Sequence, residues 1–429
     1  MLGLYKGVIH MKLEFVEASK EDYRGFHKNH KYRNFMNSCE MIRLKQERGS
    51  EVEVLGVKGG NEYIAMCAVF YQPLMKKFHY ACIQRGMLID YRDKEVFNFF
   101  IHELKKHVSK KGCVYLHMDP YITYKERDIN GDEVANGFSN EDIIQILEDA
   151  GFQHQGFTVG NSEKYQPRWT FALPLKGKTK EDVLANMHKR TRYNVHKAIH
   201  DEVCIKELTT KDLPIYLDIM EHTGERRHFD IRDHKFYKDY LDAYGDKAKL
   251  LLAYLDVPKY INKQKKYQDE SKEIIAKHEQ LLNSSSEKKC QKCKNIIKAE
   301  KDKIHTYQNN IDEVLTLKET YGNEIPLSAC IFVIEDTEII YLFGGSYKHL
   351  LKYKANYALQ WHMIQMAIER GCSQYNFYGI SGDFREEAQD YGIFKFKQGF
   401  DGYVEELIGD FILPIKKEHY KLYNLIKKQ

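Results

Sequence analysis

Apolar and polar residues follow a regular order over residues 327–382. Two short apolar runs, at 329–334 and 339–343, predict strands. A helix with apolar positions three or four residues apart follows and ends at Gly371, after which 374–378 predicts a further strand. This order of elements indicates an α/β unit.

The first half of the chain repeats this order. Its helix carries apolar residues on one face and ends at Gly112. The predicted strands around that helix lie at 67–71, 78–83 and 114–118. We interpret the repetition as two copies of one α/β domain. Coincidence between two ordinary α/β segments is the alternative.

A different pattern occupies residues 258–321. Apolar residues recur there every seven positions in two series, first Tyr260, Tyr267, Ile274 and Leu281, then Cys290, Ile297, Ile304 and Ile311. The polar run 283–286 separates the two series. Sustained heptads around a polar turn predict an antiparallel helical hairpin. The other faces are rich in Lys and Glu, so we expect this arm to project into solvent.

The sequence contains nine cysteines, an odd number for a full set of disulfides. A reduced, cytoplasmic setting fits this count. Cys290 and Cys293 have the spacing of half a zinc site, but no second pair lies at metal-binding spacing. We therefore assign Cys290 to the seam of the hairpin and expect no metal.

The chain has 429 residues, of which 43% are hydrophobic, and this predicts two to three globular domains. The net charge is only +4, so partners must be inferred from local clusters. No apolar run approaches the roughly 20 residues that span a bilayer, and the N-terminus lacks the apolar region of a signal peptide. We expect a cytoplasmic protein, and peripheral contact with the inner face of the membrane is compatible with the sequence.

Residues 179–255 contain two basic clusters. Thr179 with Asp182 predicts a capped helix that reaches about His200. This helix carries the candidate phosphate-binding residues Arg190, Arg192 and Lys197. The second cluster, at 225–232, falls in a predicted loop, where arginines suit phosphate or carboxylate binding. A solvated helix face and a surface ion-pair network are the alternatives.

Three further residues lie where reactive groups are expected. Asp119 follows the predicted strand 114–118, a position that faces ligands in α/β proteins, and capping of a turn is its alternative role. Lys395 and Lys397 alternate along a strand-like stretch, where a lysine either neutralises a developing negative charge or is simply exposed.

The common phosphate-binding and nucleophile motifs are absent from the sequence, and no convincing Cys–His nucleophile arrangement is present. An enzyme of this design would have to position two reactants for direct attack. One of the two would already be activated.

Several motifs, in order over nearly the whole chain, together resemble the FemABX family of peptidoglycan peptidyltransferases. Each motif is modest alone, and their order and spacing are specific. They are Asn34-Phe35-Met36-Asn37-Ser38 with Lys45, Arg85-Gly86-Met87-Leu88-Ile89-Asp90-Tyr91, His117-Met118-Asp119-Pro120, Gln166-Pro167-Arg168, Arg192-Tyr193-Asn194-Val195, Thr223-Gly224-Glu225-Arg226, Arg232-Asp233 with Phe236-Tyr237, the run from Tyr341 to Ser346, Asn356-Tyr357-Ala358-Leu359-Gln360-Trp361, and Tyr391-Gly392-Ile393 with Phe396-Lys397.

The resemblance implies an α/β (α+β) fold of two tandem GNAT-like acyltransferase domains with an inserted antiparallel coiled-coil arm. Domain 1 would cover 1–174 and be completed by about 402–429. Domain 2 would cover 175–401, and the arm at 258–321 would be inserted in it. Family members transfer an amino acid from aminoacyl-tRNA to the stem peptide of a lipid-linked or UDP-linked muramyl-peptide precursor. The product begins or extends the interpeptide bridge.

The resemblance also implies partners. Aminoacyl-tRNA, carrying Gly, Ala or Ser, would be the co-substrate, and no further cofactor is expected. Such a protein would act as a monomer or a homodimer. The arm resembles the tRNA-contacting hairpin of seryl-tRNA synthetases, which favours tRNA binding, and dimerisation or bracing of the domain is the alternative.

Roles for individual residues follow from the resemblance as well. Lys45 and Arg232 would bind the phosphates of the precursor, with support from Tyr347. Phe236 stands where a precursor-contacting Tyr is expected, so Tyr237 would have to supply that contact. The catalytic candidates are Lys397, which would stabilise the developing charge or seat the terminal ribose and phosphate of the tRNA, and Asp119 as a base.

Two other functions stay open at this point. One is an acyl-CoA-dependent N-acetyltransferase of the same fold, although its usual pyrophosphate-binding loop has no good copy in the sequence. The other is a non-catalytic tRNA-binding protein that uses the arm and the Arg190 helix.

Overall fold

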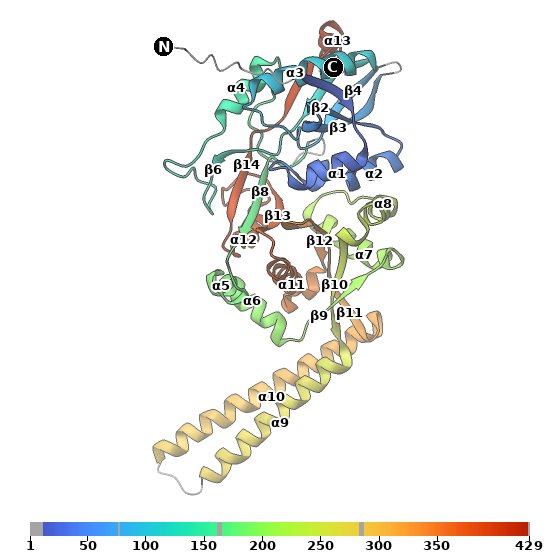
Figure 1. Cartoon of the computed structure of the whole chain (residues 1–429). Helices are drawn as coiled ribbons and strands as arrows, with labels where there is room; N and C mark the ends of the chain where they lie inside the picture. Colours follow the sequence, from blue (N-terminus) through green and yellow to red (C-terminus); the bar gives the residue numbers. More distant parts are fainter. Residues whose placement is uncertain (1–11, 76–77, 161–164, 283–286, 428–429) are drawn as a thin grey trace.

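The computed structural model describes residues 12–75, 78–160, 165–282 and 287–427. Two α/β bodies lie against each other, and a long helical hairpin projects from the second (Figure 1). The first sheet has seven strands in the order β1-β2-β3-β4-β5-β15-β7. These strands are β1 (Leu13–Glu17), β2 (Glu51–Gly59), β3 (Glu62–Met75), β4 (Phe78–Ile83), β5 (Cys113–Met118), β7 (Gln153–His154) and β15 (Phe411–Pro414).

The second sheet has eight strands in the order β6-β14-β8-β13-β12-β11-β10-β9. These strands are β6 (Thr123–Glu126), β8 (Trp169–Pro174), β9 (Cys204–Leu208), β10 (Ala248–Asp256), β11 (Glu324–Ile334), β12 (Glu338–Ser346), β13 (Gln374–Ile380) and β14 (Tyr403–Leu407). Each sheet contains one parallel pair, β4 with β5 and β12 with β13. The repeated order of elements in the sequence thus corresponds to two similar sheets.

The sheets exchange strands near the expected domain boundary. β6 and β8 precede residue 175 in the chain but belong to the second sheet, and β15 returns to the first. The division between the sheets therefore does not follow a single cut at residue 174. The domain ranges themselves stay a prediction.

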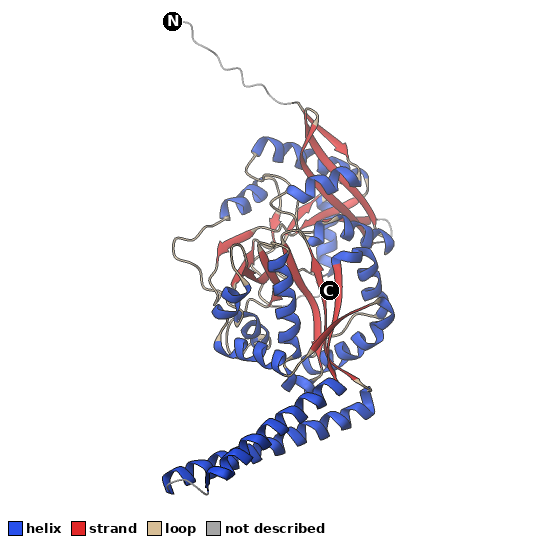
Figure 2. Ribbon diagram, turned by 60° about the horizontal axis from the view of Figure 1, so that its bottom comes forward, coloured by secondary structure: helices blue, strands red, loops and turns tan. Residues whose placement is uncertain are grey.

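Helices cover both faces of the first sheet. The α3 and α4 helices pack on one face through side chains such as Phe100 and Leu147. The α1 and α2 helices share the other face with the second body, where Phe35 and Ile340 belong to one core (Figures 1 and 2). Their bounds are α1 (Lys20–Asn29), α2 (Cys39–Glu47), α3 (Lys94–Lys110) and α4 (Glu141–Asp149).

The helices of the second body differ in places from the sequence prediction. These helices are α5 (Lys180–Asn186), α6 (Lys189–His200), α7 (Leu213–Arg227), α8 (His234–Tyr244), α11 (Ala355–Glu369) and α12 (Tyr391–Gln398). The last described helix, α13 (Lys417–Lys427), lies on the first body. The predicted Thr179–Asp182 capping box is confirmed, but the helix breaks after Met187, and His188 caps α6 instead. The α7 helix extends to Arg227, so part of the second basic cluster is helical and not in a loop.

The strand predicted around Lys397 is wrong, because this residue lies in α12. Phe394 and Lys397 are both buried three residues apart, whereas Lys395 is exposed. The spacing is therefore helical, and the short alternation of lysines imitated a strand.

The predicted arm is confirmed as two long helices, α9 (Val257–Leu282) and α10 (Glu287–Tyr321), which contact each other along their length (Figure 2). The predicted turn at 283–286 lies outside the described residues. The seam also contains polar pairs: Ser271 donates to Glu300 at 2.8 Å, and Asn310 donates to Gln264 at 3.2 Å. The heptads therefore alternate apolar layers with hydrogen-bonded ones.

Candidate active site

The two parallel strand pairs differ at their carboxyl ends. In the first sheet, β4 and β5 stay paired as far as Ile83 and Met118. In the second sheet, the β12–β13 register ends at Ile340 and Asn376, although both strands continue. The strands separate there, and β13 has an irregular register just beyond Asn376. Tyr378 at this point has a φ of 61°. The separation leaves an opening in the hydrogen-bonded surface of the second sheet.

Lys397 of α12 lies against this irregular part of β13. Its ammonium group donates to the carbonyl oxygens of Gly379, at 2.6 Å, and Tyr378, at 3.4 Å. The residue is 4% exposed. Burial lowers the pKa of Lys397 to about 7, with Asp390 acting in the opposite direction. Lys397 therefore changes charge near neutral pH, unlike a surface lysine.

Asp119 lies just beyond β5, at the carboxyl end of the parallel pair of the first sheet. One carboxylate oxygen accepts a hydrogen bond from the backbone N–H of Arg85 at 2.9 Å, and the other lies 3.4 Å from the Arg85 guanidinium. That second oxygen has no hydrogen-bond partner among the described residues. Burial raises the pKa of Asp119, and the opposing charge of Arg85 limits the rise. Such a carboxylate can accept a proton from a bound amine.

Tyr378 connects these two candidates. Its backbone carbonyl accepts the hydrogen bond from Lys397, and its hydroxyl donates to Gln166 at 3.0 Å. Burial raises the pKa of Tyr378, while the charge of Arg85 and a hydrogen bond with it lower that pKa. Asp119 and Lys397, predicted separately, thus stand at opposite ends of one polar chain that crosses between the sheets.

A second polar chain crosses the same face of the first sheet and was not found in the sequence. The Sγ of Cys82 lies 3.5 Å from Nδ1 of His117, and Nε2 of that imidazole lies 2.7 Å from Asp410. Burial disfavours the charged imidazole, but the bonds with Asp410 and Cys82 raise the pKa of His117 to about 11. The contact between Cys82 and His117 joins two residues that the sequence did not connect, and the expectation of no Cys–His nucleophile stays a prediction.

A cationic cluster lies between α2 and α8. Arg48 donates to the carbonyl of Phe236 at 2.8 Å, and its guanidinium lies 4.5 Å from the centre of that ring. Arg232 approaches the same ring at 5.8 Å. Burial lowers the pKa of Lys45, the charge of Cys82 raises it, and the charge of Arg48 lowers it. Lys45, Cys82 and Arg48 are therefore close enough for their charges to interact. The structure thus brings Lys45 and Arg232 together and adds Arg48, which the sequence did not indicate.

The two tyrosines predicted to bind substrate are both buried. Tyr237 is 2% exposed and packs edge-to-face on Tyr216 and on Phe236. Burial raises the pKa of Tyr237, while a backbone hydrogen bond and the charge of Arg232 lower it, so this tyrosine borders the Lys45–Arg232 cluster. Tyr347 is equally buried, and its hydroxyl donates to Asp218 of α7.

The predicted phosphate-binding residues of α6 lie near the base of the arm. Arg190 is exposed, Arg192 donates to the carbonyl of Ala185 at 2.5 Å, and Lys197 pairs with Asp201 at 2.6 Å. Lys197 also lines a cavity of about 450 Å³. Of the three predicted residues, only Lys197 reaches this cavity.

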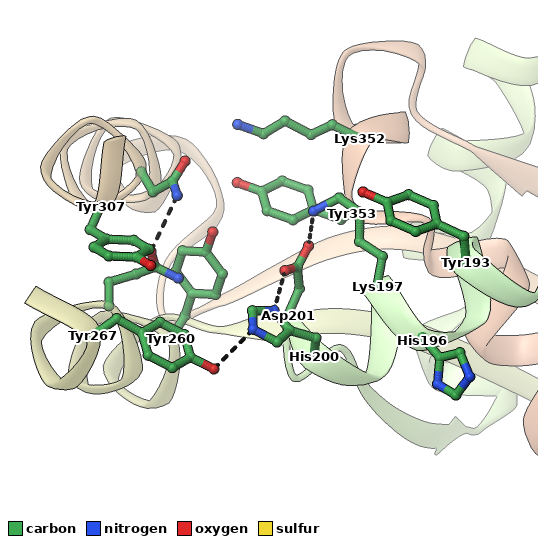
Figure 3. A pocket seen from close by; sticks show the side chains of 12 residues that line it. Tyr193, His196, Lys197, His200, Asp201, Tyr260, Tyr267, Tyr307, Lys352 and Tyr353 are labelled. Carbon is green, nitrogen blue, oxygen red and sulfur yellow. Dashed lines mark hydrogen bonds and ion pairs between the residues drawn. The ribbon is translucent and has the colours of Figure 1, made fainter. Parts of the chain in front are cut away.

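Five of the twelve residues that line this cavity are tyrosines (Figure 3). The Tyr267 ring stacks on His200 with 5.4 Å between centres, and its hydroxyl lies 3.0 Å from that imidazole. The aromatic lining residues come from α6, both arm helices and the segment after β12, and are Tyr193, His196, His200, Tyr260, Tyr267, Tyr307 and Tyr353. Aromatic faces beside lysines suit stacked bases and phosphates.

The two similar sheets define the class of fold, a tandem α/β architecture, and the polar chain between them carries a candidate base and a candidate charge-stabilising group. The model of the FemAB family matches residues 18–428, and the chain belongs to this family. The chain is 35% identical over 419 residues to the Aminoacyltransferase FemA of Staphylococcus aureus (strain N315), a match that covers 97% of this chain and 99% of the relative. The Aminoacyltransferase FemA of Staphylococcus epidermidis gives the same identity and coverage.

Among solved structures, the chain is similar to the crystal structure of FemX, with 25% identity and a TM-score of 0.78. The match covers 95% of this chain and 99% of FemX. These findings confirm the family resemblance and the predicted tandem α/β fold. They also confirm the enzyme class, which is that of an aminoacyltransferase.

Proposed function

We propose that this enzyme transfers an amino acid from aminoacyl-tRNA to the stem peptide of a muramyl-peptide precursor and so builds a peptidoglycan interpeptide bridge. Membership of the FemAB family and the similarity to FemA support this function. The observation that carries it is the polar chain from Asp119 through Arg85 and Tyr378 to Lys397. In this polar chain the candidate base, Asp119, lies at the end of the first sheet, and the candidate charge-stabilising group, Lys397, lies beside the second sheet.

The acceptor would bind on the side of the first sheet. Both precursor types carry a pyrophosphate, and the Lys45, Arg48 and Arg232 cluster offers the donors that a pyrophosphate requires. From this cluster, Cys82 and His117 lead across the sheet face towards Asp119. A stem peptide that follows this line would bring its amine to the carboxylate of Asp119.

The donor would bind on the side of the second sheet. The opening between β12 and β13 has Lys397 at its edge, and α6 with the tyrosine-lined cavity extends a basic and aromatic surface towards the arm. An RNA end fits such a surface because bases stack on aromatic rings while lysines neutralise phosphates.

The chemistry requires no covalent enzyme intermediate. The acceptor amine attacks the ester carbonyl of the aminoacyl-tRNA, a C–N bond forms, and Asp119 takes the proton that the nitrogen loses. Protonated Lys397 stabilises the negative charge on the carbonyl oxygen. The C–O bond to the terminal ribose then breaks, and the ribose oxygen takes up one proton in exchange for the one that Asp119 releases, which restores the carboxylate. Because the ester is already activated, orientation and charge stabilisation are enough.

Two-substrate kinetics test this division between acceptor and donor sides. Arg232→Ala should raise the KM for the precursor about tenfold or more, because a charge-assisted bond is lost, and leave the KM for aminoacyl-tRNA unchanged. Lys238→Ala is the matched control, since this residue is 50% exposed on the adjoining α8 helix and pairs with Asp242. A rise in the KM for aminoacyl-tRNA alone would contradict the assignment.

A further inference from the structure

The C-terminal helix α13 exposes an apolar stripe. Leu422, Leu425 and Ile426 are 54%, 64% and 54% exposed. Their spacing places them on one side of the helix. On the opposite side, Tyr420 and Tyr423 pack against Tyr115 of β5, with 5.4 and 5.8 Å between ring centres. The helix is thus fixed to the sheet by one face and presents three large apolar side chains to solvent with the other.

Basic residues surround this stripe. Lys417 and Lys421 are exposed on the helix, and Lys416 lies just before it, 5.5 Å from the ring of Phe78. Lys105 of α3 is close enough to Lys417 for their charges to interact. The acidic residue of the helix, Glu418, pairs with Lys421 at 3.0 Å. An apolar stripe bordered by lysines is the pattern of helices that lie in the interface of an anionic bilayer.

The position of α13 connects this surface with the acceptor side of the site. Tyr80 of β4 lies close to both Cys82 and Tyr423 of α13. Burial raises the pKa of Tyr80, and the charges of Cys82, Tyr423 and Tyr165 raise it further. The α13 helix therefore lies over the same part of the sheet as Cys82. Figure 1 shows α13 at one end of the molecule and the arm at the other. A flat surface against α13 would therefore leave the arm free. Among the described residues, no helix is long and apolar enough to cross a membrane.

We propose that α13 docks the enzyme on the surface of an anionic bilayer. Leu422, Leu425 and Ile426 enter the interface, and Lys417 and Lys421 contact phosphate headgroups. The proposal rests on the proposed function, because a lipid-linked precursor would be presented at such a surface on the side of the first sheet, where the Lys45–Arg232 cluster lies. The arm would then point away from the bilayer, where an RNA donor can reach it.

Sedimentation of the full chain with vesicles tests this proposal. Wild-type protein should sediment with phosphatidylglycerol vesicles, and less with phosphatidylcholine vesicles or at high salt. The variant Leu422→Gln/Leu425→Gln/Ile426→Gln should reduce the bound fraction about tenfold or more. The control is Ile199→Gln/Ile215→Gln/Leu351→Gln, which changes three residues of the second body with 38–54% exposure and should bind like wild type.

Three outcomes would overturn the proposal. Wild-type protein could fail to bind phosphatidylglycerol vesicles, or the α13 variant could bind them as well as wild type. Self-association that the α13 variant abolishes, without vesicle binding, would assign the stripe to a second copy of the chain. An unchanged unfolding midpoint of the α13 variant excludes misfolding as the cause of lost binding. The assay contains neither donor nor precursor, so a failure of transfer with intact vesicle binding would contradict only the proposed function.

Discussion

The substitution Lys397→Met removes the buried charge beside β13 and keeps most of the side-chain volume. Burial shifts the pKa of Lys397 from 10.5 to about 7. Between these values the unfolded chain binds a proton that the folded enzyme does not, so the stability of the wild type falls as the pH is lowered from 10.5 to 7. At about 1.4 kcal/mol per pKa unit, the cost at pH 7 is about 4 kcal/mol.

The variant avoids this cost but loses the hydrogen bonds to Gly379 and Tyr378, each worth about 1 kcal/mol. We therefore expect Lys397→Met to be more stable than wild type by about 2 kcal/mol at pH 7, and to lose this advantage as the pH approaches 10. Transfer activity should nevertheless fall about 10²–10³-fold, the usual effect of removing one charge-stabilising group. A variant that is more stable and less active identifies a residue kept for function.

Urea unfolding at pH 7 and pH 9, together with single-turnover transfer, measures both effects. Lys395→Met is the matched control, because this lysine lies on the same helix and is exposed. In the wild type, kcat/KM should decline as the pH rises through about 7, since the protonated form of Lys397 is the active one. Unchanged transfer by Lys397→Met would refute the assigned role, and a less stable variant at pH 7 would refute the argument from burial.

Three further predictions concern other parts of the site. Asp119→Asn cannot accept a proton, so kcat should fall about 10²–10⁴-fold with little change in the KM for the precursor; a kcat within about fivefold of wild type would exclude a base at this position. Iodoacetamide should modify Cys82, which lies beside a protonated imidazole, faster than Cys204, whose sulfur donates to the carbonyl of Glu202 at 3.4 Å. Bound precursor should protect Cys82. Equal labelling of the two cysteines by peptide mass spectrometry, or labelling of Cys82 that precursor does not change, would contradict the proposed position of the acceptor. Tyr193→Ala at the cavity should raise the KM for aminoacyl-tRNA at least about fivefold, as expected for one lost base stack, and an unchanged value would remove this surface from the donor side.

Local periodicity predicted the larger features of the fold. The heptads from Tyr260 to Ile311 predicted the arm, because a period of seven that continues on both sides of a polar turn is specific to paired helices. The repeated order of strands and helices predicted the two similar sheets. By contrast, the strand exchange by β6 and β8 has no local signal, since either strand could pair in either sheet.

The candidate site was predicted less completely, because its contacts join distant positions. Cys82 and His117 are 35 residues apart, and Asp410 lies 293 residues from the imidazole it contacts. Arg48 lies at the end of α2, and nothing in the local sequence indicates that α8 packs Phe236 against its guanidinium. The resemblance gave Tyr237 a role in binding the precursor, and its burial beside Arg232 follows from the packing of α8, which no local pattern indicates.

The most direct test of the proposed transfer reaction is the mass of the product that the purified enzyme makes. The enzyme is incubated with lipid-linked precursor and, in turn, each of a panel of charged tRNAs, with acetyl-CoA as a separate donor. We predict that at least one aminoacyl-tRNA adds an amino-acid residue to the stem peptide, and that acetyl-CoA adds nothing. Acetylation of an amine without transfer from any aminoacyl-tRNA would contradict the proposed function and favour an acyl-CoA-dependent acetyltransferase.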